Sequence, residues 1–159
     1  MHCYYESPIG TLEIRTKHKA LVGLKFITKK TKNIEQQTPF QQKVCRQLND
    51  YFFYNLKTFN IEIELEGTDF QKRIWNYLET IPYGTTVSYQ SVANALNIPS
   101  STIVIGKSIG KNPILIVIPC HRVIGIDGAL KGYSGGLHRK AKLLELENKK
   151  YFCSLPLED

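Results

Sequence analysis

The sequence predicts an α+β fold with two domains, residues 1–66 and residues 67–159. In the first, several segments alternate hydrophobic with polar residues, a period that is typical of half-buried strands. In the second, hydrophobic residues recur mostly at intervals of three and four, as they do in helices that pack on a core. The predicted boundary is Gly67, because the next residues, Thr68–Gln71, have the capping-box pattern that starts a helix.

The first domain is predicted to contain strands and one helix. Residues 12–15 and 20–27 have strand patterns, and Pro39 opens a helix, since proline is tolerated in the first helical turn. Residues 61–66 alternate strictly and give the clearest strand prediction in the chain. No pattern in this half indicates catalysis.

The second domain begins with three predicted helices. The first ends at Pro82–Gly84, the second starts at the N-cap Ser88, and Ser100 or Ser101 can cap the third. Two successive helices joined by a short polar turn have the outline of a helix-turn-helix. Thr102–Ile105, however, is wholly β-branched, so intrinsic propensity favours a strand there. Gly110 and Asn112-Pro113 end the segment abruptly.

A hydrophobic run, Ile114–Ile118, leads into Pro119 and then Cys120-His121-Arg122. Such a run predicts a buried core strand that ends in reactive side chains. A buried, inert thiol is the simpler alternative, because free cysteine is among the most buried residues. A turn at Gly125–Gly128 and a glycine-rich loop at Gly132–Gly136 follow. Such a loop lets backbone approach a ligand closely.

The last predicted helix runs from about Leu137 to Lys149 and carries an acid on its hydrophobic stripe. Glu147 lies at helical spacing from Leu137, Ala141 and Leu144. A buried carboxylate needs a partner, so Glu147 either has one or lies in solvent at a frayed helix end.

The chain has a net charge of +7, which favours an anionic partner such as nucleic acid. The Lys29 cluster is most simply a solvated loop, whereas a later group of cations flanks the Cys-His stretch: Lys107, Lys111, Lys131, Arg139, Lys140 and Lys142. No segment is long and hydrophobic enough to span a bilayer, and the N-terminus lacks a signal-peptide pattern, so a soluble cytoplasmic protein is expected.

The four cysteines, Cys3, Cys45, Cys120 and Cys153, form no C-x-x-C pair and are expected to be free thiols. Cys3 with His2 and His18 could hold zinc, but structural zinc sites have paired ligands at tight spacing. We therefore expect no metal and no cofactor.

Several motifs together resemble one family, the O6-alkylguanine-DNA alkyltransferases, also called methylated-DNA–protein-cysteine S-methyltransferases. The resemblance covers about residues 67–147 closely and the first half more loosely. It rests on Gly67-Thr-Asp-Phe-Gln71, Ile81-Pro-Tyr-Gly84, Ser88-Tyr-Gln90, Asn112-Pro113, Ile118-Pro-Cys-His-Arg-Val123, Tyr133-Ser-Gly-Gly-Leu137 and Glu147. A Cys-His pair alone is a weak signal, whereas this combination is highly specific.

The resemblance implies a fold and a function. The fold is a ribonuclease-H-like N-terminal domain, with a three-stranded antiparallel sheet and a helix, followed by a mostly helical domain with a winged or helix-turn-helix DNA-binding unit. In that unit Thr102–Ile105 is helical. The function is direct repair of O6-alkylguanine, and to some extent O4-alkylthymine, in double-stranded DNA. The alkyl group moves irreversibly to the protein's own cysteine, once per molecule, and the protein acts as a monomer.

The resemblance also implies a role for each site residue. Cys120 is the nucleophile, His121 removes its proton through a water, Glu147 orients His121, and Asn112 hydrogen-bonds in the turn before the cysteine. Tyr89 supplies a proton to N3 of the guanine and crowds the phosphate 3′ to the lesion. The remaining lesion contacts are the Val123 carbonyl, the Tyr133 ring, the Ser134 amide and the flexible backbone of Gly135.

On DNA, the resemblance implies that the helix-turn-helix enters the minor groove, which admits base flipping with little sequence readout. Small residues on the second helix suit close approach, and lysines contact phosphate. The DNA-contacting residues are Ile103, Gly106, Lys107, Ser108, Lys111 and Arg122. Ile103 departs from the family, which usually has an arginine there to replace the flipped base. An apolar wedge can still hold the stack open, although it cannot hydrogen-bond the orphan cytosine.

Three other functions compete with alkyl transfer. Relatives with tryptophan in the cysteine position bind alkylguanine as sensors, but Cys120 is present here. A turnover hydrolase usually takes its cysteine and histidine from separate segments, whereas Cys120 and His121 are adjacent. A DNA-binding regulator with a structural thiol would leave Glu147 and the glycine-rich loop unexplained.

Overall fold

The computed structural model describes residues 1–29, 36–98 and 102–151. The chain divides into two compact units, Met1–Glu66 and Gly67–Asp159. The predicted cap at Ser100 or Ser101, and Cys153, lie outside the described residues. Among the helices of the described part, none has the length and hydrophobicity to cross a membrane.

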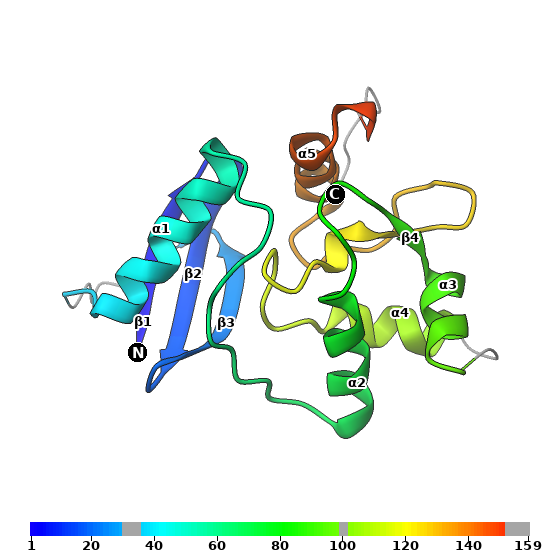
Figure 1. The fold of residues 1–159 in the computed structure, drawn as a ribbon, viewed down its shortest axis with the longest axis horizontal. Helices are drawn as coiled ribbons and strands as arrows, with labels where there is room; N and C mark the ends of the chain where they lie inside the picture. Colours follow the sequence, from blue (N-terminus) through cyan, green and yellow to red (C-terminus); the bar gives the residue numbers. More distant parts are fainter. Residues whose placement is uncertain (30–35, 99–101, 152–159) are drawn as a thin grey trace. The chain divides into compact units, whose positions relative to one another are not determined.

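Unit 1 contains the expected three-stranded antiparallel sheet, in the order β1-β2-β3. The strands are β1 (His2–Ser7), β2 (Gly10–Lys17) and β3 (Ala20–Ile27), and helix α1 (Pro39–Phe53) lies across the sheet (Figure 1). The hydrophobic core of unit 1 contains side chains from β2, β3 and α1, and each of the following is fully buried: Leu12, Ile14, Leu21, Leu24, Val44 and Leu48. The helix begins with a reciprocal capping box between Thr38 and Gln41.

The prediction of a strand at residues 61–66 is wrong. This segment makes a single isolated bridge, between Ile63 and Leu21. It is held by two hydrogen bonds, from Leu21 N to Glu62 O at 2.8 Å and from Glu64 N to Leu21 O at 3.0 Å. Strict alternation reflects an extended backbone with one side turned inward, and such a backbone need not pair along its length.

Unit 2 contains four helices and a two-stranded parallel ribbon in the described residues. The helices are α2 (Asp69–Leu78), α3 (Tyr89–Ala95), α4 (Thr102–Gly110) and α5 (Leu137–Glu147), and the ribbon pairs β4 (Val87–Ser88) with β5 (Val123–Ile124). The predicted caps at Thr68 and Ser88 are confirmed, since each side chain accepts a backbone N–H hydrogen bond.

Helix α4 packs against α3 and α2, as expected for a helix-turn-helix supported by a third helix. Its β-branched first turn is helical because tertiary contacts override propensity. Ile105 and Ile109 are buried in the core, and the indole Nε1 of Trp75 on α2 donates to the Ser108 carbonyl oxygen at 2.8 Å.

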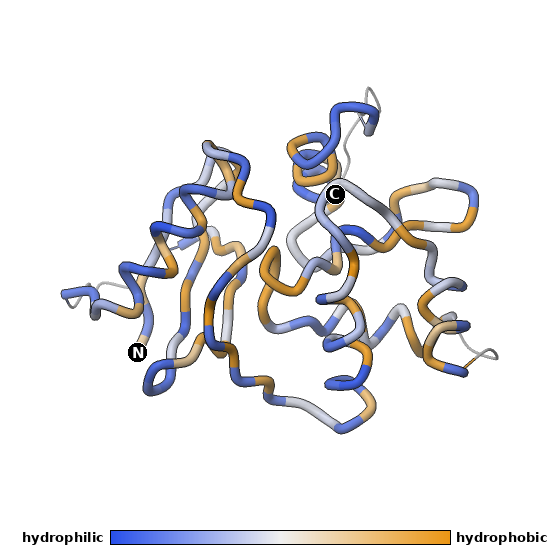
Figure 2. Tube along the Cα trace, viewed as in Figure 1, coloured by the Kyte–Doolittle hydropathy of each residue, from blue (hydrophilic) through white to orange (hydrophobic). Residues whose placement is uncertain are grey.

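The hydrophobic run Ile114–Ile118 is buried as expected, but it is not a strand. It folds into a tight turn, which Figure 2 colours as a hydrophobic segment. Leu115 and Ile118 form an isolated bridge, and Ile116 between them has φ of 72°. A β-branched residue in this left-handed region is strained, so the surrounding structure has to impose the turn.

Candidate active site

Two consecutive three-residue turns position Cys120. Val117 N donates to Leu115 O at 2.8 Å around Ile116, and Cys120 N donates to Ile118 O at 2.8 Å around Pro119. Pro119 has φ −81° and ψ 61°, the ordinary inverse γ-turn, and the chain then enters a short 3₁₀ helix, η1 (Cys120–Arg122). The chain therefore reverses direction immediately before the cysteine.

Asn112 holds this reversal closed. Its Nδ2 donates to Ile118 O at 2.8 Å, and its Oδ1 accepts from Ile114 N at 2.9 Å. Both ends of the turn are thus bound to one buried amide. The same side chain hydrogen-bonds Cys120, which makes the predicted role of Asn112 in this turn geometrically possible.

Cys120 itself is buried, with 4% of its surface exposed. Burial raises the pKa of the thiol to about 11, although the Asn112 hydrogen bond and the charge of Lys140 act in the opposite direction. The sulfur is therefore protonated at neutral pH. It becomes a nucleophile only when a nearby base accepts its proton.

Glu147, at the end of α5, binds both His121 and Arg122. His121 Nε2 lies 2.7 Å from Glu147 Oε2. Arg122 donates from Nε to Oε1 at 2.8 Å and from Nη2 to Oε2 at 2.9 Å, which is the bidentate arrangement of a strong charge-assisted pair. Less than a tenth of each of these three side chains is exposed. Glu147 is therefore a buried acid with partners and does not lie in solvent.

The segment between α2 and β4 completes this ion cluster. Arg122 Nη1 donates to Ile81 O at 2.6 Å, and Gly84 N donates to Glu147 Oε1 at 3.3 Å. The Arg122 guanidinium also lies 5.8 Å from the centre of the Tyr83 ring. Gly84 has φ of 79°, and a Cβ there would lie 3.2 Å from Glu147 O. A glycine is thus favoured both by the backbone conformation and by the close approach of α5.

Burial and the charges of this cluster together determine the protonation of His121. Burial alone would raise the pKa of Glu147, but the charges and hydrogen bonds of His121 and Arg122 outweigh burial and hold it well below its ordinary value. Burial lowers the pKa of His121 more than Glu147 raises it, and Arg122 adds to the lowering. His121 is consequently neutral at pH 7.

The tautomer of neutral His121 follows from its partner. A carboxylate can only accept, so Nε2 carries the hydrogen and Nδ1 carries the lone pair. Nδ1 is buried and has no hydrogen-bond partner among the residues that the structure describes. It is an available base one residue from Cys120.

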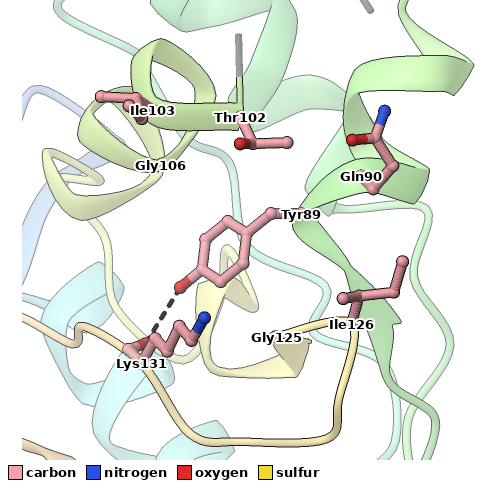
Figure 3. Close-up of a pocket in the computed structure, with 8 residues that line it drawn as sticks. All are labelled: Tyr89, Gln90, Thr102, Ile103, Gly106, Gly125, Ile126 and Lys131. Carbon is pink, nitrogen blue, oxygen red and sulfur yellow. Dashed lines mark hydrogen bonds between the residues drawn. The ribbon is translucent and has the colours of Figure 1, made fainter.

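A pocket of about 330 Å³ opens next to Tyr89, between α3, α4 and the loop after β5 (Figure 3). Tyr89 Oη donates to Lys131 O at 2.9 Å, and the ring lies between the two sides of the pocket. The other lining residues are Gln90, Thr102, Ile103, Gly106, Gly125 and Ile126. The side chains of Ile103 and Ile126 are 72% and 83% exposed, so the pocket mouth has exposed hydrophobic residues on both sides.

Two family models together match nearly the whole described chain. Residues 1–65 match the model described as the ribonuclease-like domain of 6-O-methylguanine DNA methyltransferase, and residues 69–149 match the model of its DNA-binding domain. The chain belongs to the 6-O-methylguanine DNA methyltransferase family.

Individual relatives support this assignment. The methylated-DNA–protein-cysteine methyltransferase of Mycolicibacterium paratuberculosis is 42% identical over 97% of this chain and 96% of its own length. That of Methanosarcina barkeri is 43% identical over 89% of this chain and 93% of its own length. The crystal structure of Mycobacterium tuberculosis OGT in complex with DNA has a TM-score of 0.84 and 41% identity, and it covers 94% of this chain and 93% of that one.

The structure brings together the residues predicted to be catalytic in this family member. Cys120, His121, Glu147 and Asn112 are all buried and are linked by the contacts described above. Val123 is buried directly after η1, paired with Val87. In the glycine-rich loop Ser134 is exposed, Gly135 is buried, and the buried Tyr133 hydroxyl has no hydrogen-bond partner in the described part of the chain.

Two of the predicted DNA contacts have little exposed surface in this methyltransferase fold. Arg122 is 6% exposed and binds Glu147 and Ile81, so its side chain belongs to the ion cluster. Ser108 is 7% exposed because it lies on the inner face of α4. Lys107 and Lys111 are exposed, and Ile103 and Gly106 line the pocket, so these four remain compatible with a DNA-facing surface.

Lys140 is a site residue that the sequence pattern placed only among the cations near the Cys-His stretch, with no role of its own. Its side chain is fully buried on α5, where Nζ donates to Lys131 O at 2.6 Å and to Gly132 O at 3.3 Å and lies 5.7 Å from the centre of the Tyr89 ring. Burial lowers the pKa of Lys140 to about 8, while the charge of Cys120 acts the other way. The available signal was a lysine at helical spacing from Leu137, Leu144 and Glu147.

We expect the free energy of unfolding of the wild type to rise at alkaline pH, and we expect Lys140→Met to remove this rise. Folded Lys140 loses its proton near pH 8, whereas the unfolded residue keeps it to about pH 10.5, so the unfolded chain binds more protons in this window. The free energy of unfolding therefore rises with pH, by about 3 kcal/mol across the window. Urea denaturation of both proteins between pH 7 and 10.5 measures it. Lys142→Met, at an exposed position of α5, should keep the rise, and a pH-independent difference between wild type and Lys140→Met would contradict this assignment.

Proposed function

We propose that this protein repairs DNA directly by moving the alkyl group of O6-alkylguanine, and to a lesser extent O4-alkylthymine, to its own Cys120. The observation that carries this proposal is the buried Cys120 thiol next to a neutral His121 whose Nδ1 is available as a base. A thiol with a pKa of about 11 needs such a base. Family membership and a relative crystallised with DNA support the same reaction.

The reaction begins with a proton transfer from the Cys120 sulfur to His121 Nδ1, through a water. The thiolate attacks the alkyl carbon, a carbon–sulfur bond forms, and the carbon–O6 bond breaks with its electrons moving to the guanine. Glu147 stabilises the imidazolium as it forms, and Arg122 keeps Glu147 ionised so that it can do so. Lys140 is the cation that favours the thiolate. The thioether product is stable, so each molecule acts once.

The leaving guanine is an anion until it is protonated, and in this proposal Tyr89 donates that proton to N3. Its hydroxyl lies at the pocket, where it donates to the Lys131 carbonyl, and lesion binding would exchange that partner for the base. The Val123 carbonyl accepts from the guanine amino group, and the Ser134 amide donates to O6. Tyr133 forms a wall of the lesion site, with the backbone of Gly135 beside it.

One monomer binds double-stranded DNA through the minor groove at the lesion. The exposed Lys107 and Lys111 at the end of α4 contact phosphates, which makes binding salt-dependent and nearly independent of sequence. Gly106, at the pocket, lets the backbone approach the base that leaves the stack.

One experiment tests the reaction. The protein is incubated with an excess of duplex that contains O6-methylguanine, and the intact protein and its peptides are weighed. We expect one added methyl group, on the Cys120 peptide, saturating at one per molecule. Tight lesion binding without any adduct would instead support a lesion sensor, and continued product formation beyond one equivalent would support a turnover enzyme.

Ile103→Arg is expected to increase the rate of repair of duplex DNA. Ile103 is exposed at the pocket mouth, where an arginine can enter the gap left by the flipped base and hydrogen-bond the orphan cytosine. One added hydrogen bond corresponds to about a 10-fold faster second-order rate. The rate with free O6-benzylguanine should stay unchanged, because no duplex has to be opened.

Val104→Arg is the matched control, since it adds the same charge to an exposed position of the same helix that does not line the pocket. Equal gains for both variants would mean that added charge alone accelerates association. Equal effects of Ile103→Arg on duplex and free base would contradict a role in opening the duplex.

A further inference from the structure

Two further cysteines lie in unit 1, where β1 packs against α1. Alternate residues of a strand face the same side, about 7 Å apart, which is close to the spacing of helix residues four apart. Tyr5 on β1 meets α1 in this way: its hydroxyl donates to Asn49 Oδ1 at 3.4 Å, and its ring stacks on Phe52 at 6.2 Å. Cys3 precedes Tyr5 on β1 by one strand repeat, and Cys45 precedes Asn49 on α1 by about one helical turn. The same spacing therefore brings Cys3 to Cys45.

The two thiols contact each other at that position. Cys3 is buried, with 4% exposed, and its thiol hydrogen-bonds the sulfur of Cys45, which is partly exposed. Gln37 Nε2 donates to the Cys45 sulfur at 3.7 Å from the other side. Two sulfurs in hydrogen-bond contact meet the first requirement of a disulfide, which is that the two side chains point toward each other.

The two cysteines differ in reactivity. The hydrogen bond from Cys3 lowers the pKa of Cys45 against the effect of burial, and the Gln37 amide adds to the lowering. The same hydrogen bond, together with burial, raises the pKa of Cys3. Cys45 is thus the more acidic and more accessible thiol, with Cys3 behind it. This is the arrangement of an attacking cysteine and a resolving cysteine.

We propose that Cys3 and Cys45 are a site of reversible oxidation, forming a disulfide that joins β1 to α1. The oxidant is a hydroperoxide. The Cys45 thiolate attacks one peroxide oxygen, the O–O bond breaks, and a sulfenic acid and hydroxide form. The Cys3 sulfur then attacks the Cys45 sulfur, the S–O bond breaks, and water leaves with the Cys3 proton. Two thiols and one hydrogen peroxide give one disulfide and two waters, and a small-molecule thiol reverses the reaction.

This site is independent of the proposed repair reaction. Cys120 belongs to unit 2 and is fully buried with a pKa of about 11, so it reacts more slowly with peroxide than the more acidic, accessible Cys45. Oxidation at Cys45 therefore occurs first and leaves the repair cysteine reduced. The chain thus holds two cysteine chemistries, one reversible and one irreversible.

The test uses the full-length reduced protein and a small excess of hydrogen peroxide. One aliquot is freed of peroxide by desalting and weighed intact, and a second is unfolded, labelled with N-ethylmaleimide and digested without reductant. We expect a loss of two hydrogens, a cross-linked peptide that joins Cys3 to Cys45, and labelling of Cys120. Dithiothreitol should restore the original mass of the unlabelled aliquot.

Variants identify the pair. Cys3→Ser and Cys45→Ser should each abolish the loss of two hydrogens, and Cys3→Ser should leave a trappable sulfenic acid on Cys45. Cys153→Ser should behave as the wild type does. A cross-link between any other two cysteines, or a sulfinic acid on Cys45 of the wild type with no cross-link, would overturn the proposal. The wild-type peptide map decides this even if a variant does not fold.

Discussion

Replacement of Cys120 by serine is expected to leave a protein that transfers no alkyl group to itself. Burial already raises the pKa of the thiol to about 11, and a hydroxyl in the same position starts from a much higher pKa, so neutral His121 cannot deprotonate it. We expect the second-order rate with O6-methylguanine duplex to fall at least about 1,000-fold. Intact-mass spectrometry over time measures the fraction of protein that carries a methyl group.

The serine variant should still bind the methylated duplex, because the thiol contributes little contact surface in its buried position. Fluorescence anisotropy with a labelled duplex checks this. Cys45→Ser is the matched control and should keep the wild-type rate, since Cys45 lies in the other unit. Methylation of the Cys120→Ser protein at an unchanged rate would show that another residue is the acceptor.

Arg122→Ala is expected to lower the free energy of unfolding by about 3–5 kcal/mol, the usual cost of breaking a buried ion pair from one side. It removes two hydrogen bonds to the buried Glu147 carboxylate and the donor to Ile81 O. Urea denaturation at pH 7 measures the loss. Lys142→Ala, at an exposed position, should change the free energy by less than about 0.5 kcal/mol.

The same substitution should shift the pH dependence of alkyl transfer. Without the Arg122 charge, Glu147 stabilises a proton on His121, so the pKa of His121 rises and less of it is a free base at neutral pH. The rate of Arg122→Ala should therefore fall most at pH 6–7 and recover partly above it. A less stable variant with an unchanged pH–rate profile would mean that Arg122 has only a structural role.

Acid stability gives a second readout of this cluster. Glu147 has a folded pKa below its unfolded value of about 4.5, so its ionisation stabilises the protein above that pH, and the contribution is lost as the pH falls toward the folded pKa. Arg122→Ala raises the folded pKa and shrinks this contribution. At pH 7 the free energy of unfolding of the variant should be lower than that of the wild type. Between about pH 4.5 and 3, however, it should fall by less than that of the wild type does.

Features that depend on neighbouring residues could be predicted from the sequence. The helix starts at Thr68 and Ser88 were predictable because a cap joins residues three apart. The sheet in unit 1 and the helix-turn-helix followed from hydrophobic periodicity together with the family resemblance. Cys120 and His121 were recognisable as a reactive pair because they are adjacent and lie among specific motifs.

In three segments the local pattern and the tertiary structure disagree, although the family resemblance had already predicted the helix at Thr102–Ile105. Residues 61–66 alternate strictly, yet pair with β3 at a single residue. Thr102–Ile105 has strand propensity, yet burial of Ile105 and the Trp75 hydrogen bond to α4 keep it helical. The run Ile114–Ile118 has a strand composition, yet Asn112 bonds to both ends of it and closes it into a turn with Ile116 at positive φ.

By itself, the sequence determined the kind of chemistry: a cysteine, an adjacent histidine, an acid on a later helix, and basic residues for an anionic partner. Only the tertiary structure decided which groups act on one another. Arg122 lies inward and binds Glu147. Burial of His121, with the Arg122 charge acting in the same direction, leaves His121 uncharged, and its Nδ1 has no partner in the described part of the chain. Lys140 lies beside the Tyr89 ring, and its charge acts on Cys120. These pairings join residues far apart in the chain, and burial, which sets their charges, exists only once the core has formed.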